Sequence, residues 1–398
     1  MSWTTKRLEE VADFTLGKML DQRKNRGEPF PYLANVNVRW GTFELDDLRI
    51  MKFEHHEMER YSLNYGDIVM CEGGEPGRCA IWKAQQPGMM FQKALHRIRP
   101  HSGLDAYFLF YFFLLTGKTG GFAPYFTGST IKHLPREKLA RIEISIPPLP
   151  IQQRIASVLS TYDELITANC RRIALLEESA RLLYREWFVN LRFPGKNPRL
   201  EKSPTLPNGW QYQSLSAVAE LNRSSLNVKN SPETIRYLDI SSVEKGRIKE
   251  PSEISFSEAP GRARRLVTHG DIIWSCVRPE RRSYALIWEP TPNLVVSTGF
   301  SVVSAIKIPF TFLYLSITTA DFVDYLKGRA TGAAYPAVTA KDFESASILI
   351  PDEETLNLFD DACRPTLEMI NCLHKQNKKL MEARDALLPK LMSGALLL

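Results

Sequence analysis

Arginine side chains are the groups in this sequence whose type and spacing suggest a binding chemistry. The segment from Gly261 to Tyr284 contains no lysine but six arginines, namely Arg262, Arg264, Arg265, Arg278, Arg281 and Arg282. A guanidinium can donate paired hydrogen bonds to O6 and N7 of guanine in the major groove of DNA, or hold a phosphate, whereas lysine acts more as a point charge. The segment is therefore a candidate nucleic-acid surface, with a solvated face as the alternative.

The first half of the chain contains a second set of basic candidates. Its early loops include Arg23 and Lys24, and a flexible turn runs from Gly73 to Arg78. This turn aligns with the segment from Arg278 to Arg281 in the second half. Two copies of one scaffold that read different DNA sequences would differ in this way, with the same place in the fold and other side chains.

A third pair of candidate loops shares a Thr-Gly dipeptide. The stretch from Thr127 to Leu134 corresponds to that from Thr331 to Val338, and the residues after the glycine diverge. Small and hydroxylic residues there could approach a DNA backbone or a base edge closely, although a plain turn is the alternative. The candidates for contacts with bases are Arg78, Ser129, Lys132, Arg278, Arg281, Arg282 and Tyr335. The candidates for contacts with phosphates are Arg23, Lys24, Arg262, Arg264 and Arg265.

The sequence lacks the motifs of the common catalytic and cofactor sites. The Gly-Lys-Thr at Gly117 lacks the earlier glycine of a phosphate-binding loop, since Phe112 stands at that position. No lysine has Asp or Glu two residues before it, as many nucleases require, and there is no GxSxG, GxGxxG or HExxH pattern. The tetrapeptide with which amino-methyltransferases hold the target amine is also absent. We expect no catalytic residue, no metal site and no cofactor in this chain.

The two halves of the chain repeat each other with an offset of 204 to 207 residues. Matching positions include Trp3 and Trp210, Tyr32 and Tyr237, Gly66 and Gly270, Trp82 and Trp288, Thr127 and Thr331, and Pro147 and Pro351. Matches in the same order with nearly constant offset indicate a duplicated unit of about 200 residues. Each unit begins with strand-like runs between turns rich in Gly, Pro, Asn and Ser, which predicts an α/β (α+β) domain.

A long helix is predicted to follow each mixed region. No proline or glycine occurs from Ile151 to Phe193, and apolar residues recur at heptad spacing. The predicted rows of the seam contain Leu159, Ile166, Ile173, Ala180 and Trp187, and Ile155, Tyr162, Asn169, Leu176 and Leu183. The corresponding row of the second helix contains Ile370, Leu373, Asn377, Leu380, Arg384 and Leu387. Such an apolar stripe predicts a coiled-coil seam, and helices of this length would act as spacers.

Single polar residues and a proline modify this helical pattern. Asn169 and Asn377 could fix the register of the two helices, or could point into solvent at the edge of the seam. Pro365 is expected to bend the second helix or to delay its start, because proline lacks the amide hydrogen that the helix needs. The candidates for packing against a partner are Leu165, Leu182, Tyr184 and Phe188, with burial in the core as the alternative.

These patterns predict five segments. They are a first recognition domain at 1–150, a spacer helix at 151–193, a linker at 194–208, a second recognition domain at 209–351 and a C-terminal spacer helix at 352–398.

Composition excludes several other classes of protein. Of the 398 residues, 44% are hydrophobic and 24% are charged, as in ordinary globular domains. The six cysteines show no CxxC pair, and the longest apolar run is too short to cross a membrane. A net charge of +6 suits a polyanion without requiring one. We expect a cytoplasmic protein with reduced thiols.

The chain resembles the specificity subunit of type I restriction-modification systems over essentially its whole length. The residues that carry the resemblance are SIPPLPIQQRIASVL at Ser145–Leu159, the GDIVM and GDIIW strands, and TGSTIKHL with its weaker copy TGAAYPAV. The second junction, IPDEETLNLF at Ile350–Phe359, departs from the pattern because it lacks the proline pair and the two glutamines. The capping and subunit contacts of this second junction are therefore less well defined.

The resemblance implies a non-catalytic reader of double-stranded DNA. Its two target recognition domains would be held apart by an antiparallel pair of long coiled-coil helices. Each domain would bind one half of a split, asymmetric site, with the gap set by the helices. Two modification (methyltransferase) subunits would pack on the helices and supply S-adenosylmethionine and adenine methylation, and restriction (translocase and nuclease) subunits would join them. The alternative function is that of a helical scaffold or adaptor that does not bind DNA.

Overall fold

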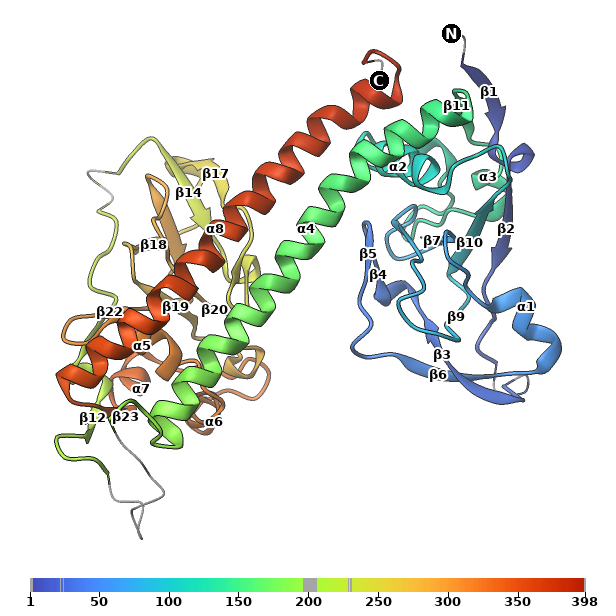
Figure 1. Ribbon diagram of the computed structural model, residues 1–398. Coiled ribbons are helices and arrows are strands. Elements are labelled where there is room, and N and C mark those ends of the chain that lie inside the picture. The colour runs from blue at the N-terminus through green and yellow to red at the C-terminus, as the bar shows by residue number, and fades with distance from the viewer. Residues whose placement is uncertain are drawn as a thin grey trace. The chain divides into compact units, whose positions relative to one another are not determined.

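The computed structural model describes residues 3–21, 23, 25–195, 206–227, 229 and 231–396 (Figure 1). The chain forms two compact units, of which unit 1 comprises Met1–Ala168 with Gln376–Leu398 and unit 2 comprises Asn169–Lys375. Each unit includes part of both long helices, whereas the sequence pattern predicted the helices as separate segments. Most of the predicted linker, 196–205, lies outside the described residues. No helix within the described ranges is long and apolar enough to cross a bilayer.

Unit 1 is built on an antiparallel four-stranded sheet in the order β2-β10-β7-β8. Its strands are β2 (Ala12–Leu16), β10 (Leu95–Pro100), β7 (Ile68–Cys71) and β8 (Cys79–Ile81). Every residue of β7 is buried, because the side chains on its two faces enter different clusters. Ile68 and Met70 pack with α2 (Ala106–Lys118), while Val69 and Cys71 pack with Trp82 and its neighbours.

The remaining elements of unit 1 are small. A three-stranded sheet has the order β6 (Arg49–Phe53), β3 (Glu28–Leu33) and β9 (Met90–Phe91). Strand β1 (Thr4–Arg7) pairs with β11 (Glu143–Ile146), and β4 (Val38–Arg39) pairs with β5 (Thr42–Phe43). Two one-turn helices are α1 (Met58–Tyr61) and α3 (Arg136–Leu139).

Unit 2 repeats this arrangement, as the sequence repeat predicted. Its four-stranded sheet has the order β13-β22-β19-β20, with β13 (Ala219–Leu221), β22 (Phe300–Ala305), β19 (Ile272–Ser275) and β20 (Tyr284–Leu286). A second four-stranded sheet has the order β17 (Ser252–Ser255), β14 (Thr234–Leu238), β21 (Leu294–Ser297) and β18 (Ala263–Leu266). The other elements are β12 (Gln211–Ser214), β15 (Val243–Glu244), β16 (Arg247–Ile248), β23 (Ser347–Ile350), α5 (Phe310–Ser316), α6 (Ala320–Arg329) and α7 (Ala340–Glu344).

The two long helices are α4 (Leu149–Tyr184) and α8 (Glu353–Met392). A π-helical turn, Arg185–Val189, extends α4, so this helix ends before the predicted limit of 193. The IPPLPIQQ segment fixes its start through Gln152, whose buried side-chain amide donates to the carbonyl oxygens of Pro147 (2.9 Å) and Gly103 (3.1 Å). The amide oxygen of Gln152 accepts a hydrogen bond from the backbone of Asp105, the N-cap residue of α2.

The two long helices pack against each other in each unit, as predicted. In unit 1, Ile155 and Leu159 of α4 share a core with Leu388 and Leu391 of α8. In unit 2, α4 and α8 meet in another core, where the rings of Trp187 and Phe359 lie 5.6 Å apart. Asn169 and Asn377 are only 8% and 6% exposed, so the expectation that they point into solvent is wrong.

The second long helix begins without the proline pair of the first. Asp352 caps α8, because its carboxylate accepts hydrogen bonds from the backbone N–H of Thr355 (2.9 Å) and from the indole of Trp210 (2.8 Å). Burial raises the pKa of Asp352, but these hydrogen bonds outweigh it and lower the pKa overall. Pro365 lies well inside α8, so the expected delay of the helix start is wrong. Tertiary packing around Cys363 and Leu367 offsets the lost backbone hydrogen bond.

Candidate nucleic-acid interface

Two loops of unit 1 meet beside the four-stranded sheet. We call residues 72–78, between β7 and β8, the first turn, and residues 127–133 the first hairpin. Backbone hydrogen bonds close the first hairpin in both directions between Thr127 and His133, at 2.8 and 2.9 Å. A β-bridge from Gly73 to His133 joins the first turn to the first hairpin.

Unit 2 holds an equivalent pair of loops. The second turn is residues 276–283, between β19 and β20, and the second hairpin is residues 331–337. Thr331 and Ala337 exchange backbone hydrogen bonds of 3.0 and 2.9 Å, and Val277 bridges to Ala337. The fold therefore brings the turn and the Thr-Gly stretch together in both units, although the sequence had presented them as separate candidates.

The second turn carries arginines where the first turn carries glycines. Strand pairing sets the equivalence, because Met70 pairs with Cys79 and Trp274 pairs with Tyr284, which makes the second turn one residue longer. Gly74 then corresponds to Arg278, with φ of +81° and +51°. Gly77 likewise corresponds to Arg282, with φ of +90° and +55°. A left-handed backbone costs a non-glycine residue roughly 1–2 kcal/mol, and such strain is often found at functional sites.

Arg278 links the second turn to the second hairpin. Its guanidinium carbon lies 4.7 Å from the ring centroid of Tyr335, and its Nη2 donates to the carbonyl oxygen of Ala334 at 3.1 Å. Its backbone N–H donates to the carbonyl oxygen of Pro336 at 2.7 Å. The Tyr335 side chain is 70% exposed. This arrangement preorganises a guanidinium stacked on an aromatic ring, with its remaining N–H groups available.

The other two arginines of the second turn differ in exposure. Arg281 is exposed, and none of the described residues forms a hydrogen bond or ion pair with its side chain. Arg282 is half-buried and contributes to a cationic region with Arg181 and Lys245. Burial, followed by the charges of Arg181 and Arg282, lowers the pKa of Lys245. Arg281 is therefore the guanidinium that the second turn presents most openly.

The contacts of Arg78 favour a structural role over the predicted DNA contact. Its side chain is only 14% exposed and is bound to Glu75 at 2.6 Å and to the carbonyl oxygen of Asn35 at 2.8 Å. In the repeat it corresponds to Ser283, because the extra residue of the second turn comes before it. Arg78 thus holds the first turn from inside. Sequence alignment had placed it among the arginines of the second turn.

The first hairpin presents small, cationic and apolar side chains. Ser129 and Lys132 are both exposed, and the Lys132 ammonium lies 5.9 Å from the ring centroid of Phe126. Ile131 is 65% exposed and was missed by the sequence reasoning, which considered only charged, hydroxylic and aromatic groups. Its equivalence to Tyr335 through the offset of 204 was the signal that could have identified it.

The predicted phosphate contacts are more dispersed. Arg23 is exposed in a loop of unit 1, and Lys24 lies outside the described residues. Arg262 is 58% exposed but forms an ion pair with Asp239 at 2.7 Å. The guanidinium of Arg264 lies 5.2 Å from the ring centroid of Phe256, and Arg265 is half-buried. Arg262, Arg264 and Arg265 lie at β18, and the charge of Arg265 acts on Cys276 at the start of the second turn.

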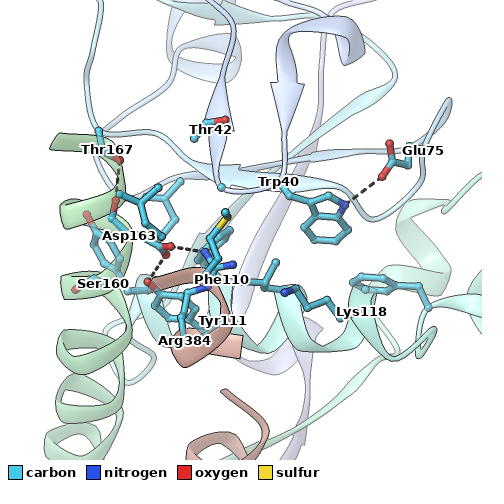
Figure 2. Close-up of a pocket in the computed structure, with 18 of the residues that line it drawn as sticks. Trp40, Thr42, Glu75, Phe110, Tyr111, Lys118, Ser160, Asp163, Thr167 and Arg384 are labelled. Atoms are coloured by element: carbon cyan, nitrogen blue, oxygen red, sulfur yellow. Dashed lines mark hydrogen bonds and ion pairs between the residues drawn. The ribbon is translucent and has the colours of Figure 1, made fainter. Parts of the chain in front are cut away.

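A cavity of about 510 Å³ lies in unit 1 between the domain and the two helices. In Figure 2, Asp163 of α4 lies between Tyr111 and Arg384, and the Trp40 indole points toward Glu75 of the first turn. The Tyr111 hydroxyl donates to Asp163 at 2.7 Å, and the Trp40 indole donates to Glu75 at 3.1 Å. These contacts form two separate groups: one joins α2 to both long helices through Asp163, and the other joins Glu75 of the first turn to Trp40.

The same cavity explains the Gly-Lys-Thr sequence of α2. A Cβ atom at Gly117 would overlap the ring of Trp40, and the ammonium of Lys118 binds Asp385 of α8. The glycine and lysine therefore serve packing and an ion pair. In unit 2 the equivalent space is smaller, about 80 Å³, and Trp288 is among the residues that line it.

One group of side chains in the described part of the chain has the spacing of a metal site. It consists of Glu54, His56 and Glu57, near the start of α1. Glu57 is already bound by the buried ammonium of Lys18. This group therefore does not argue for a metal ion.

The predicted partner-packing residues separate into two pairs. Tyr184 and Phe188 lie in the core of unit 2, where the Phe188 ring is 4.8 Å from Phe359. Their packing supports the alternative of core burial for these two residues. Leu165 and Leu182 are 48% and 38% exposed, so their side chains reach the surface of the helices.

Comparison with known proteins identifies relatives along the chain. Residues 1–178 match a family model described as type I restriction modification DNA specificity domain. The MjaIX specificity subunit of a type I restriction enzyme from Methanocaldococcus jannaschii is 26% identical over 358 residues, which cover 83% of this chain and 78% of the relative. The HindI specificity subunit from Haemophilus influenzae is 30% identical over 135 residues, which cover 33% of this chain and 29% of the relative.

A solved structure shares the fold. The S subunit of a type I restriction-modification system from M. genitalium superposes with a TM-score of 0.57 and 16% sequence identity. The match covers 98% of this chain and 96% of that one. The duplicated α/β units and the two long helices are therefore an architecture found in a protein of known structure.

Proposed function

The chain is a specificity subunit of a type I restriction-modification system, which recognises the DNA target site, and from this premise we propose that it reads a bipartite double-stranded site with one half for each unit. The observation that carries the proposal is the turn and hairpin pair, which recurs in both units with the same backbone bridges and unlike side chains. A duplicated frame with different exposed groups suits two different half-sites.

Within this proposal the exposed groups of the loops have separate roles. Arg278, Arg281 and Tyr335 read bases in one half-site, and Ser129 and Lys132 contact the other. Arg282, which is half-buried beside them, contacts the same half-site as Arg278 and Arg281. Arg23, Arg262, Arg264 and Arg265 meet phosphates, which position the protein without reading sequence.

The chemistry of the system belongs to partner subunits, because the specificity subunit is itself non-catalytic and carries no cofactor. We propose that two modification subunits pack on α4 and α8, with Leu165 and Leu182 among the contacts, and methylate adenine with S-adenosylmethionine. Restriction subunits would bind to that complex. The length of the helices would set the gap between the half-sites, and the complex would act on DNA in the cytoplasm.

Binding to duplex DNA at two salt concentrations tests the proposal. The chain is purified with its methyltransferase, and the methylated motif is first mapped by sequencing DNA from cells that express both. We expect tight binding to a duplex with the motif, weaker binding to a scrambled duplex, and a steep fall of affinity with salt as counterions are released. A helical scaffold without DNA binding predicts negligible affinity for both duplexes. Nothing in the structure favours that alternative.

A further inference from the structure

Ile131 lies at the tip of the first hairpin with 65% of its surface exposed. A single exposed aliphatic residue is common on protein surfaces and indicates nothing by itself. The repeat makes this residue informative, because the equivalent position in the second hairpin is Tyr335, which is 70% exposed. The scaffold therefore presents a large side chain with an apolar surface at the same position in both units.

The backbone fixes the position of this side chain in both hairpins. Gly128 and Gly332 adopt left-handed φ angles of +88° and +105°. A Cβ atom at Gly128 would overlap the carbonyl oxygen of Ile131, and one at Gly332 would lie 3.0 Å from the carbonyl oxygen of Tyr335. The tip folds back onto its glycine, so the residue three positions later is held in place rather than left on a free loop.

The neighbours of Ile131 suit a surface that faces DNA. Ser129 and Lys132 are exposed on the same hairpin, and the bridge at His133 joins the hairpin to the first turn. An isoleucine side chain has no hydrogen-bonding group. The feature of a base edge in the major groove that matches it is the methyl group at C5 of a pyrimidine.

We propose that Ile131 is a specificity-determining residue of unit 1 that contacts the C5 methyl group of a pyrimidine in its half-site. The inference rests on the proposed function and adds the chemical group that is recognised. Unit 2 uses the same position differently, because the ring of Tyr335 stacks on Arg278. A thymine or a 5-methylcytosine offers the same methyl group, and the experiment distinguishes them.

The test removes the methyl group from the DNA and the side chain from the protein. The purified complex with the methyltransferase is titrated against duplexes in which each thymine of the mapped motif is replaced in turn by deoxyuridine. We expect one replacement to weaken binding about three- to fivefold, the effect of losing one buried methyl group. The Ile131→Ala complex should bind the thymine duplex more weakly by at least this factor and should no longer distinguish thymine from deoxyuridine at that position.

Two controls separate this contact from a general effect. Ile50→Ala removes an isoleucine that is 69% exposed on β6, and it should leave the thymine preference unchanged. Thermal unfolding of Ile131→Ala should match the unmodified chain, because the side chain is largely exposed. If a cytosine occupies the position, adding a 5-methyl group should strengthen binding to the unmodified chain and not to Ile131→Ala.

The outcomes distinguish the inference from the function on which it rests. If Ile131→Ala retains the same deoxyuridine penalty at every position, or if neither methyl group changes the affinity anywhere in the motif, the methyl contact is wrong while sequence-specific binding stands. If the unmodified complex binds motif and scrambled duplexes equally, the proposed function itself is wrong.

Discussion

The first and second turns occupy the same place in the fold and use arginine in opposite ways. In unit 1 the arginine of the turn, Arg78, points inward and holds Glu75 and the backbone of Asn35. In unit 2 the turn carries three arginines, and Arg281 is exposed without a partner among the described residues. The backbone bridge to the neighbouring hairpin is the same in both units.

This difference indicates that the shared backbone fixes the position of an exposed side chain, whereas the type of side chain determines which DNA group it can contact. Gly74 and Gly77 have the left-handed backbone that glycine adopts without cost, whereas Arg278 and Arg282 adopt it with strain. Strain that persists at two positions of one exposed turn is consistent with selection for the side chains rather than for stability.

Replacing the exposed arginine of the second turn should have the largest effect of these tests, and the effect is on DNA affinity. Arg281→Ala should weaken binding to the mapped motif by about 1–3 kcal/mol if the guanidinium makes a bidentate base contact. Affinity for scrambled DNA should change much less, since a base contact adds little there. Titrations of both duplexes measure the difference, and an equal loss on the two would remove Arg281 from the base-reading residues.

Replacing the inward arginine should affect folding instead. Arg78→Ala removes hydrogen bonds to Glu75 and Asn35 and should lower the free energy of unfolding by about 1–3 kcal/mol. Urea denaturation measures this loss. The equivalent change in unit 2, Ser283→Ala, serves as the control and should have a smaller effect. A stable Arg78→Ala chain with weakened motif binding would contradict the structural role.

The cost of the left-handed backbone in the two turns can be measured at the equivalent residues Gly77 and Arg282. Gly77→Ala should destabilise the chain by about 1–3 kcal/mol, because φ is +90° and the added Cβ would lie 2.6 Å from the ring of Phe122. Arg282→Gly should leave stability unchanged or raise it by up to about 1 kcal/mol through relief of strain. Urea midpoints compare the two, and a large loss for Arg282→Gly would show that the arginine stabilises its turn.

The smallest expected effect is a pH dependence of the free energy of unfolding that arises from a histidine found in unit 1 alone. Nε2 of His96 donates to the carbonyl oxygen of Leu134 beside the first hairpin, and unit 2 has Ser301 at the equivalent strand position. Burial lowers the pKa of His96, so the unfolded chain binds the proton first as the pH falls. Stability should therefore decrease as the pH drops below about 7, through the ordinary histidine range near 6.5 and toward the lowered folded value.

Urea midpoints measured between pH 7.5 and 5 test this dependence. The His96→Gln chain should show a weaker slope in this range than the unmodified chain. Equal slopes would assign the pH dependence to other groups.

The repeat, the α/β units and the paired helices followed from the sequence because they depend on patterns that recur many times. Residues such as Leu159 and Leu373 lie on the predicted seam because heptad spacing allows one apolar face. The sequence left the role of Phe188 open, because periodicity shows that a residue is apolar but not whether a domain or a partner covers it. Pro365 was misjudged because packing around a long helix can outweigh one missing backbone hydrogen bond.

The site was harder to predict because it depends on single residues. The role of Arg78 changes with one inserted residue in the second turn, and only the strand pairs reveal where that insertion lies. Ile131 carries no charge or hydroxyl group, so a search for polar contacts passed over it. Sequence spacing brought the right loops to attention, whereas side-chain direction required coordinates.

The closure of the turns has a consequence for how new specificities can arise. The N–H of Cys71 binds the carbonyl oxygen of Arg78, and that of Ser275 binds Ser283, both at 2.8 Å, although the second loop is one residue longer. The flanking strands thus tolerate a gained or lost codon without moving. An inserted residue in these loops therefore changes which side chains the loop presents, as a substitution does, while the closing backbone hydrogen bond stays the same.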